Sequence, residues 1–458
     1  MKNTRIIPLL CFILFMFSCS KELELNPFQS LSTGEALADL PSMKTAVFGA
    51  YDAIQSLGYY GREYLVMPET EANLVYLSIA NSNRFIPSYT YLWIPADGDI
   101  TDFWNLAYAA ILRANNVINN IDALEGDAAE KNQIKGEALA IRALAHFDLV
   151  RFFAKQYTNG NPSTDLGVPI VLEASISEPP RNTVEQVYTQ VIADLTTAKG
   201  LLRDEGIYRF SPNAVEALLA RVYLYKGDWA NAETAAGNVI GAGYELADDV
   251  VAMFAGPGSS EEIFTLRNEM SENRGSDNLG NIYIPAGYGD IRVTTDLMDL
   301  YEPGDSRANL IFQHTNGEFY QSKFIEQDGV VGLHSPKLLR VAEMYLIRAE
   351  ARFRQNAADP DVLSDLNAIR LKRGATQMMS LPNGINDILA ERHRELAFEG
   401  HTAFDYWRTG TKMVRQQCNT GLEVSGVCEI EANDFRTVHP IPQREMDVNQ
   451  SMIQNDGY

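Results

Sequence analysis

Cysteine and histidine are scarce in this chain of 458 residues, which holds 4 cysteines and 6 histidines. The histidines are mostly scattered along the sequence, so none of the usual zinc-binding spacings can be drawn. The sequence also contains no Gly-x-Ser-x-Gly motif, no His-Glu-x-x-His motif and no phosphate-binding loop. We therefore predict a protein without a catalytic centre, a metal site or a bound cofactor.

Basic residues are also in deficit. The 38 lysines and arginines face 60 aspartates and glutamates, which leaves a formal net charge of −22. Such a charge repels phosphate backbones and anionic lipid, so nucleic acid is not an expected partner. Neutral ligands are compatible with this composition.

The chain lacks a long apolar run. The apolar stretch at residues 6–17 follows Lys2 and Arg5, and it is shorter than the roughly 20 residues that a transmembrane helix needs. This pattern predicts a secretory signal peptide over residues 1–18. Ser18-Cys19 directly after the run resembles a bacterial lipobox, in which Cys19 would be acylated (for example with palmitate) and become the first mature residue. An ordinary signal peptide with Cys19 near the cleavage point is the alternative.

Two cysteines are left once the signal peptide is removed and Cys19 is acylated. Cys418 and Cys428 flank a turn-rich stretch with two glycines, which would allow the two thiols to approach each other. We predict a disulfide, as expected in an oxidising compartment. Two unpaired loop cysteines are the alternative, and a metal site is disfavoured because no histidine lies close by in sequence.

Helical periodicity dominates the rest of the chain. Residues 212–240 show two apolar stripes separated by Gly227-Asp228, with Pro212 at the start of the first, which predicts a helical hairpin of the tetratricopeptide type. Similar pairs can be drawn over 103–153 and 341–373. Between them lie irregular stretches that are rich in Gly, Pro, Asn and aromatic residues, at 58–101, 158–181, 243–339 and 417–442. We predict one mainly α domain over residues 19–458, a helical scaffold with a loop-rich face formed by these inserts.

Several segments resemble the SusD/RagB family of outer-membrane nutrient-binding lipoproteins. They lie at residues 136–147, 342–351, 366–375, 388–410, 440–447 and 454–458, in the family's order. The chain departs from the family at Thr402-Ala403, where a bulkier pair is usual, and at Gln450 and Asp456, where proline is common. The acidic residues after Cys19, within residues 20–25, resemble the export signal of lipoproteins that face outward from the outer membrane.

The resemblance implies a non-enzymatic lipoprotein on the cell surface that sits as a lid on a SusC-like TonB-dependent transporter. Such proteins pass oligosaccharides, or in some members peptides, into the transporter. A peptide-binding member of the family is therefore one alternative. A surface glycoside hydrolase, which would need two carboxylates ~5–10 Å apart, and a repeat protein that binds only other proteins are two more.

Aromatic residues are dense in the insert at 58–101. A Tyr or Trp ring can receive the flat face of a sugar while polar neighbours bond its hydroxyls. We predict a ligand platform at Trp93, Tyr89 and Tyr91, with Asn73, Asn81 and Arg84 as hydrogen-bonding neighbours, and, by the resemblance, Tyr283 and Tyr288 from the insert at 243–339. The alternation of Tyr89, Tyr91 and Trp93 is equally typical of a half-buried strand.

Two acidic patterns invite a catalytic or metal-binding interpretation. Glu391, Glu395 and Glu399 recur at steps of four, among basic residues, and like charges on one helix face repel unless basic groups pair with them. Because the motif resembles part of the family's scaffold, we interpret them as residues that form ion pairs between helices. A calcium loop that starts at Asp97 would need a carboxylate at its twelfth position, where Tyr108 stands. We interpret the second pattern as a solvated turn before a helix.

Overall fold

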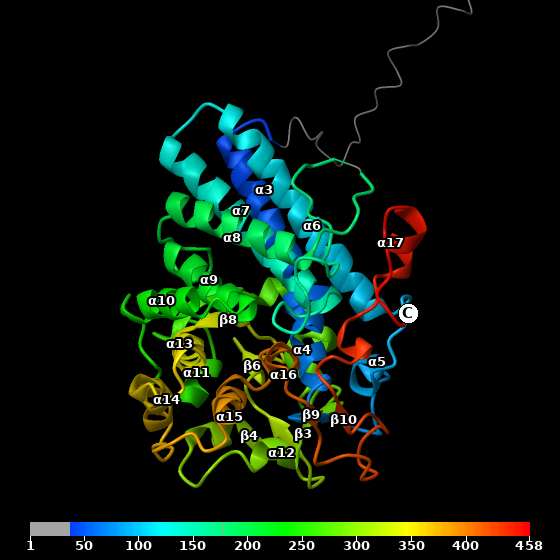
Figure 1. Ribbon diagram of the computed structural model, residues 1–458, viewed down its shortest axis with the longest axis vertical. Helices are drawn as coiled ribbons and strands as arrows, with labels where there is room; N and C mark the ends of the chain where they lie inside the picture. The colour runs from blue at the N-terminus through cyan, green and yellow to red at the C-terminus, as the bar shows by residue number, and fades with distance from the viewer. Residues whose placement is uncertain (1–36, 176) are drawn as a thin grey trace, which may run out of the picture.

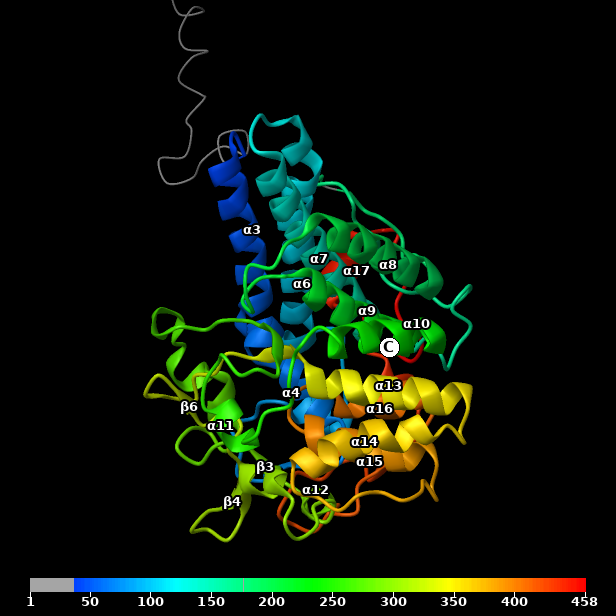
Figure 2. The ribbon, with the colours of Figure 1, turned by 90° about the vertical axis from the view of Figure 1, so that its left-hand side faces the viewer.

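The structure, a computed structural model, describes residues 37–175 and 177–458 (Figure 1). It is mainly helical, and its longest helices pack in series, each against the next, except for the last two. Figure 2 shows this series from the side, with the N-terminal helices upright and the later ones stacked below them. In chain order the members are α3 (Leu40–Gln55), α6 (Gly98–Asn120), α7 (Ala128–Phe153), α8 (Val184–Leu201), α9 (Pro212–Lys226), α10 (Trp229–Ile240), α13 (Val341–Gln355), α14 (Pro360–Lys372) and α15 (Ile385–Leu396). The last two, α14 and α15, both pack against α13.

The three predicted hairpins are confirmed as α6–α7, α9–α10 and α13–α14. Local chemistry explains the sharp turn between α9 and α10. Ser211 caps the start of α9 by accepting a hydrogen bond from the backbone N–H of Ala214 at 3.1 Å. Gly227 ends the helix at φ 74°, a left-handed conformation that glycine adopts without a steric cost, and Asp228 then caps α10. Buried Ala232 and Ala236 allow α10 to approach its neighbours closely.

The inserts carry short elements. The described residues form five two-stranded antiparallel sheets, and the pairs are β1 (Val75–Leu77) with β3 (Ile291–Val293), β2 (Glu262–Thr265) with β8 (Lys337–Arg340), β4 (Ile311–Gln313) with β5 (Phe319–Gln321), β6 (Glu326–Gln327) with β7 (Val330–Val331), and β9 (Met413–Val414) with β10 (Glu429–Ile430). The smaller helices are α4 (Glu63–Thr70), α5 (Ile86–Thr90), α11 (Val250–Phe254), α12 (Thr295–Met298), α16 (Thr402–Thr409) and α17 (Gln443–Val448). The insert at 58–101 is thus more ordered than predicted, because α4 and α5 pack together beside β1.

The three glutamates of α15 and the turn that follows it are scaffold residues, as predicted. Glu395 lies among the guanidinium groups of Arg307, Arg340 and Arg373, at 3.1, 2.6 and 2.8 Å, and all four side chains are buried. These three cations hold the pKa of Glu395 well below its usual range, despite burial that opposes them. Glu399 pairs with Arg340 at 2.8 Å in the same way. The network joins β8, α14 and α15.

The predicted signal peptide at residues 1–18 and Cys19 lie outside the described residues. Across 37–175 and 177–458, no helix combines the length and the apolar character that crossing a membrane requires.

Candidate functional site

Strand β1 brings three inserts together on one face of the molecule. On one edge it pairs with β3, with Tyr76 opposite Arg292. On the other edge it receives the loop between β9 and β10, where the N–H of Val424 donates to the carbonyl of Leu77 at 2.8 Å. Figure 1 shows β3, β9 and β10 gathered at the lower end, beside the segment that leads to α5. Segments from 58–101, 243–339 and 417–442 therefore lie side by side.

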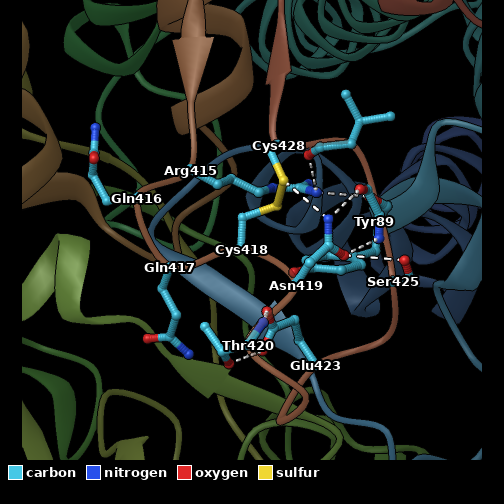
Figure 3. Close-up of a disulfide and its surroundings, with 12 residues drawn as sticks. Tyr89, Arg415, Gln416, Gln417, Cys418, Asn419, Thr420, Glu423, Ser425 and Cys428 are labelled. Carbon is cyan, nitrogen blue, oxygen red and sulfur yellow. Dashed lines mark hydrogen bonds between the residues drawn. A yellow bond between two sulfur atoms is a disulfide. The ribbon is translucent and has the colours of Figure 1, made fainter.

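A disulfide between Cys418 and Cys428 closes the base of this loop, with 5.5 Å between the two Cα atoms, as predicted (Figure 3). Asn419 lies inside the loop, and its side-chain oxygen accepts hydrogen bonds from the Ser425 hydroxyl at 3.1 Å and the Gly426 N–H at 3.2 Å. Glu423 accepts from the N–H of Thr420 at 2.6 Å. These bonds give the loop a defined shape.

The predicted platform at Tyr89, Tyr91 and Trp93 is not formed, because the structure buries all three rings. Their exposed fractions are 1%, 1% and 4%. Tyr89 and Tyr91 enclose Arg415, whose guanidinium carbon lies 4.1 and 5.8 Å from the two ring centroids. Burial raises the pKa of the Tyr89 phenol to about 12.

Trp93 is also a core residue. Its ring lies 4.6 Å from the His439 ring, and His439 in turn bonds Glu71 at 2.7 Å. Burial alternates only beyond Tyr91, where Leu92 and Ile94 are exposed at 70% and 56%; Tyr89 lies in α5, and its neighbour Thr90 is also buried. The prediction that these aromatics face a ligand is therefore wrong.

Tyr283 is a core residue, and the side chain of Asn73 is bonded to other residues of the protein. Tyr283 is 1% exposed and packs between Phe324 and Phe398, at 6.0 and 5.8 Å between ring centroids, so its predicted role as a ligand contact is wrong. Asn73 is half-buried, and it accepts a hydrogen bond from the Tyr406 hydroxyl at 2.9 Å. Its amide is thus held by a scaffold residue.

Arg84, Tyr288 and Asn81 do meet at the junction of the inserts. The Arg84 guanidinium lies 4.1 Å above the Tyr288 ring and donates to the Tyr288 hydroxyl at 3.0 Å. It also donates to the Ser82 hydroxyl at 2.9 Å. Asn81 shapes the turn that leads to Arg84, because its amide donates to the Ser78 carbonyl at 2.6 Å and its oxygen accepts from the N–H of Asn83 at 2.8 Å.

The carboxylate of Asp277 pairs with two arginines at this junction. Its carboxylate lies 2.9 Å from the Arg62 guanidinium and 3.4 Å from that of Arg84. Arg62 is buried and also pairs with Glu63 at 2.7 Å. Burial raises the pKa of Glu63 to about 7, although Arg62 opposes the shift. The sequence contains no signal for Asp277, because its contacts to Arg62 and Arg84 span 215 and 193 residues.

The resulting face is amphipathic. Arg84, Asn81 and Tyr288 offer donors, acceptors and an aromatic ring, while Ile79 and Leu422 beside them are 64% and 50% exposed. Such a mixture suits a ligand with apolar C–H faces and many hydroxyls. No group of three or more His, Cys, Asp or Glu side chains in the described parts of the chain is arranged to hold a metal ion.

Comparison with known proteins identifies the family of this chain. A family model described as "Starch-binding associating with outer membrane" matches residues 47–224, and one described as "SusD family" matches 292–458. A solved SusD superfamily protein from Bacteroides thetaiotaomicron has 30% sequence identity and a TM-score of 0.84, and the match covers 91% of this chain and 99% of that one. The chain belongs to the SusD family. The predicted family and the mainly α fold are thus confirmed.

Other SusD relatives match over nearly their whole length. A solved putative sugar-binding protein from Bacteroides vulgatus is 29% identical, with coverage of 92% of this chain and 99% of that one and a TM-score of 0.85. SusD-like protein P2 of Formosa agariphila is 26% identical over 99% of both chains. SusD family proteins are non-catalytic binding proteins that associate with the outer membrane, and this chain is one of them.

Proposed function

We propose that this SusD family member binds a neutral oligosaccharide at the face around Arg84 and Tyr288 and delivers it to a SusC-like TonB-dependent transporter. The observation that carries the proposal is the stacking of Arg84 on Tyr288 where the three inserts meet. The net charge of −22 disfavours anionic ligands. Relatives described as a starch-binding protein and a putative sugar-binding protein support the ligand class.

The contacts of Arg84 explain how a hydroxyl-rich ligand would be held. Its bonds to Ser82, Asp277 and Tyr288 fix the plane of the guanidinium before any ligand arrives. Its side chain is 32% exposed, and arginine has five N–H donors in a planar array. A fixed donor array loses little conformational entropy when it binds a sugar hydroxyl.

Substitution of the two central residues tests the site. We expect Arg84→Ala and Tyr288→Ala each to weaken glycan binding by about tenfold or more, which corresponds to roughly 1.4 kcal/mol or more. Calorimetry with a panel of neutral oligosaccharides measures the effect. Arg203→Ala is the matched control, because Arg203 is an exposed arginine paired with Glu205 away from this face. Wild-type affinity in both site variants would refute the assignment, and binding of peptides in place of glycans would favour the peptide-uptake alternative.

We propose that a lipid on Cys19 anchors the protein to the outer membrane. The anchored protein would lie on the outward-facing side of that membrane. We expect Cys19→Ala to abolish acylation, because Cys19 is the cysteine that directly follows the apolar run. Metabolic labelling with a fatty-acid probe measures this, and Cys418→Ser is the control that should still be labelled. Equal labelling of Cys19→Ala and the wild type would exclude the anchor. Co-purification with a TonB-dependent barrel tests the transporter partnership.

A further inference from the structure

A polar groove lies outside the Arg84 face. It is formed by the chain that leaves α7, the segment at 432–438 and the C-terminal segment at 453–456. Two adjoining hollows of about 370 and 360 Å³ make up the groove. They share the lining residues Lys155, Asp165, Asn433, Phe435 and Val438. Each hollow lies within the range of roughly 300–1,000 Å³ that small-ligand sites occupy.

Gln156 lines the second hollow and carries an unpaired acceptor. Its side chain is 7% exposed. The amide nitrogen donates to the Arg151 carbonyl at 2.9 Å, which fixes the orientation of the amide group. The side-chain oxygen Oε1 is buried and has no hydrogen-bond partner among the described residues. A buried acceptor without a donor is unfavourable, so this position favours a ligand that can donate a hydrogen bond.

The other walls combine an aromatic ring with neutral polar groups. Phe435 is 46% exposed, and its ring is supported edge-on by Tyr458, with 5.6 Å between the centroids. The amide groups of Asn433 and Asn455 line the groove beside it.

Arg181 and Asp456 line the first hollow without a salt bridge to any described residue, but the N–H groups of Arg181 already donate to four backbone carbonyls and to the side-chain oxygen of Asn455. Other charges of the groove are paired. Lys155 lies 3.5 Å from Asp165, and Asp434 is paired with Arg436 at 2.7 Å. A fully charged ligand would therefore find no free counter-charge at these pairs. A neutral, hydroxyl-rich ligand fits this lining best.

We propose that this groove is a second binding site, which takes one neutral sugar unit with its C–H face against Phe435 and a hydroxyl that donates to Gln156. The Arg84 face contributes none of the lining residues, so the inference does not rest on the function proposed above. Two sites on one chain would allow it to hold two glycan segments at once.

Ligand-observed saturation-transfer NMR on the full mature chain tests the groove. The probes are the methyl glycosides of glucose, galactose, mannose and xylose at millimolar concentration. The starting protein is Arg84→Ala/Tyr288→Ala, so that any signal reports a site other than the Arg84 face. We expect at least one glycoside to retain its signal in this background. Adding Phe435→Ala or Asn433→Ala should weaken its binding by about tenfold or more.

Met379→Ala is the matched control, because Met379 is an exposed apolar residue, at 83%, on the loop between α14 and α15. It should leave the signal unchanged. Melting curves of all variants separate lost binding from lost folding, and Asn433→Ala, a change at an exposed side chain, keeps the test valid if Phe435→Ala unfolds. The proposal is overturned if both groove variants keep the full signal, if no glycoside binds in the starting background, or if a trialanine probe occupies the groove and the glycosides do not.

Discussion

Arg415 organises the interior beside the proposed ligand face. Its guanidinium donates hydrogen bonds to the backbone carbonyls of Thr70, Ala72, Tyr89 and Val427 at 2.8–2.9 Å. Four otherwise unpaired carbonyls are thus satisfied by one side chain, which ties α4, α5 and the disulfide loop together. Tyr89 and Tyr91 shield this charge from solvent, so their rings serve the packing of the face and not its contact with ligand.

Trp93 provides the residue-scale test of this distinction. We expect Trp93→Ala to lower the free energy of unfolding by ~3–5 kcal/mol, because a large buried ring is replaced by a cavity. Urea unfolding measures the change. Its neighbour Leu92 is 70% exposed, so Leu92→Ala is the matched control and should change stability by no more than about 0.5 kcal/mol. A Trp93→Ala protein with wild-type stability and lost glycan binding would return Trp93 to the ligand site.

At the scale of elements, the loop between β9 and β10 acts as an added edge of β1. Its backbone bonds to Leu77 and Ile79 extend the small β1–β3 sheet by a third segment. The isolated bridge between Ser78 and Glu423 continues the same edge. A two-stranded sheet is marginal by itself, so this support depends on the loop keeping its shape.

The disulfide is therefore expected to stabilise both the loop and the face. We expect Cys418→Ser/Cys428→Ser to lower the free energy of unfolding by ~2–3 kcal/mol, as is typical for a bridge that closes a short loop. The double substitution should also weaken glycan binding, because the closed loop holds its own residue Leu422 beside Ile79. Urea unfolding with and without reductant measures the first effect. Reductant should destabilise the wild type and leave the double variant unchanged, and equal sensitivity of both proteins would contradict this role.

At the scale of the whole molecule, buried ionisable groups link the two halves of the fold. The cluster around Glu395 joins α15 to β8 and α14, while Glu69 of α4 accepts hydrogen bonds from the N–H groups of Phe398, Gly400 and His401. Buried ionic groups of this kind are strongly destabilising when one partner is lost. The same burial makes several histidines resist protonation.

His393 links this burial to acid stability. Burial lowers the pKa of His393 from 6.5 to about 4, with Arg392 contributing and Asp405 opposing. The unfolded chain therefore binds a proton in this window that the folded chain does not, so stability falls as the pH drops from 6.5 toward 4. The expected slope is about 1.4 kcal/mol per pH unit for one such group.

The measurement is urea unfolding at several pH values within this window, in the wild type and in His393→Gln. In the variant, the free energy of unfolding should fall less steeply as the pH drops, by about 1.4 kcal/mol per pH unit. Leu92→Ala is the control, because it removes an exposed side chain that carries no ionisable group, and it should keep the wild-type slope. Equal slopes in His393→Gln and the wild type would contradict the assignment.

Much of this protein follows from its sequence alone. The helical hairpins were predictable because apolar periodicity, Ser211 and Gly227 act over a few residues of chain. The disulfide was predictable because only ten residues separate Cys418 and Cys428. The scaffold role of Glu395 was predictable because its motif resembles part of the family's scaffold, and because like charges on one helix face require cations nearby.

The proposed ligand face was decided by the tertiary structure. Arg84 meets Tyr288 across 204 residues, and no local preference specifies that contact. The sequence marked an alternating stretch at residues 89–94, but the side that faces inward depends on Arg415, which lies 326 residues beyond Tyr89. The helices and turns are determined by the preferences of residues close in sequence. Which way the rings of Tyr89 and Tyr91 point was determined by Arg415 and by the distant segments that pack against them.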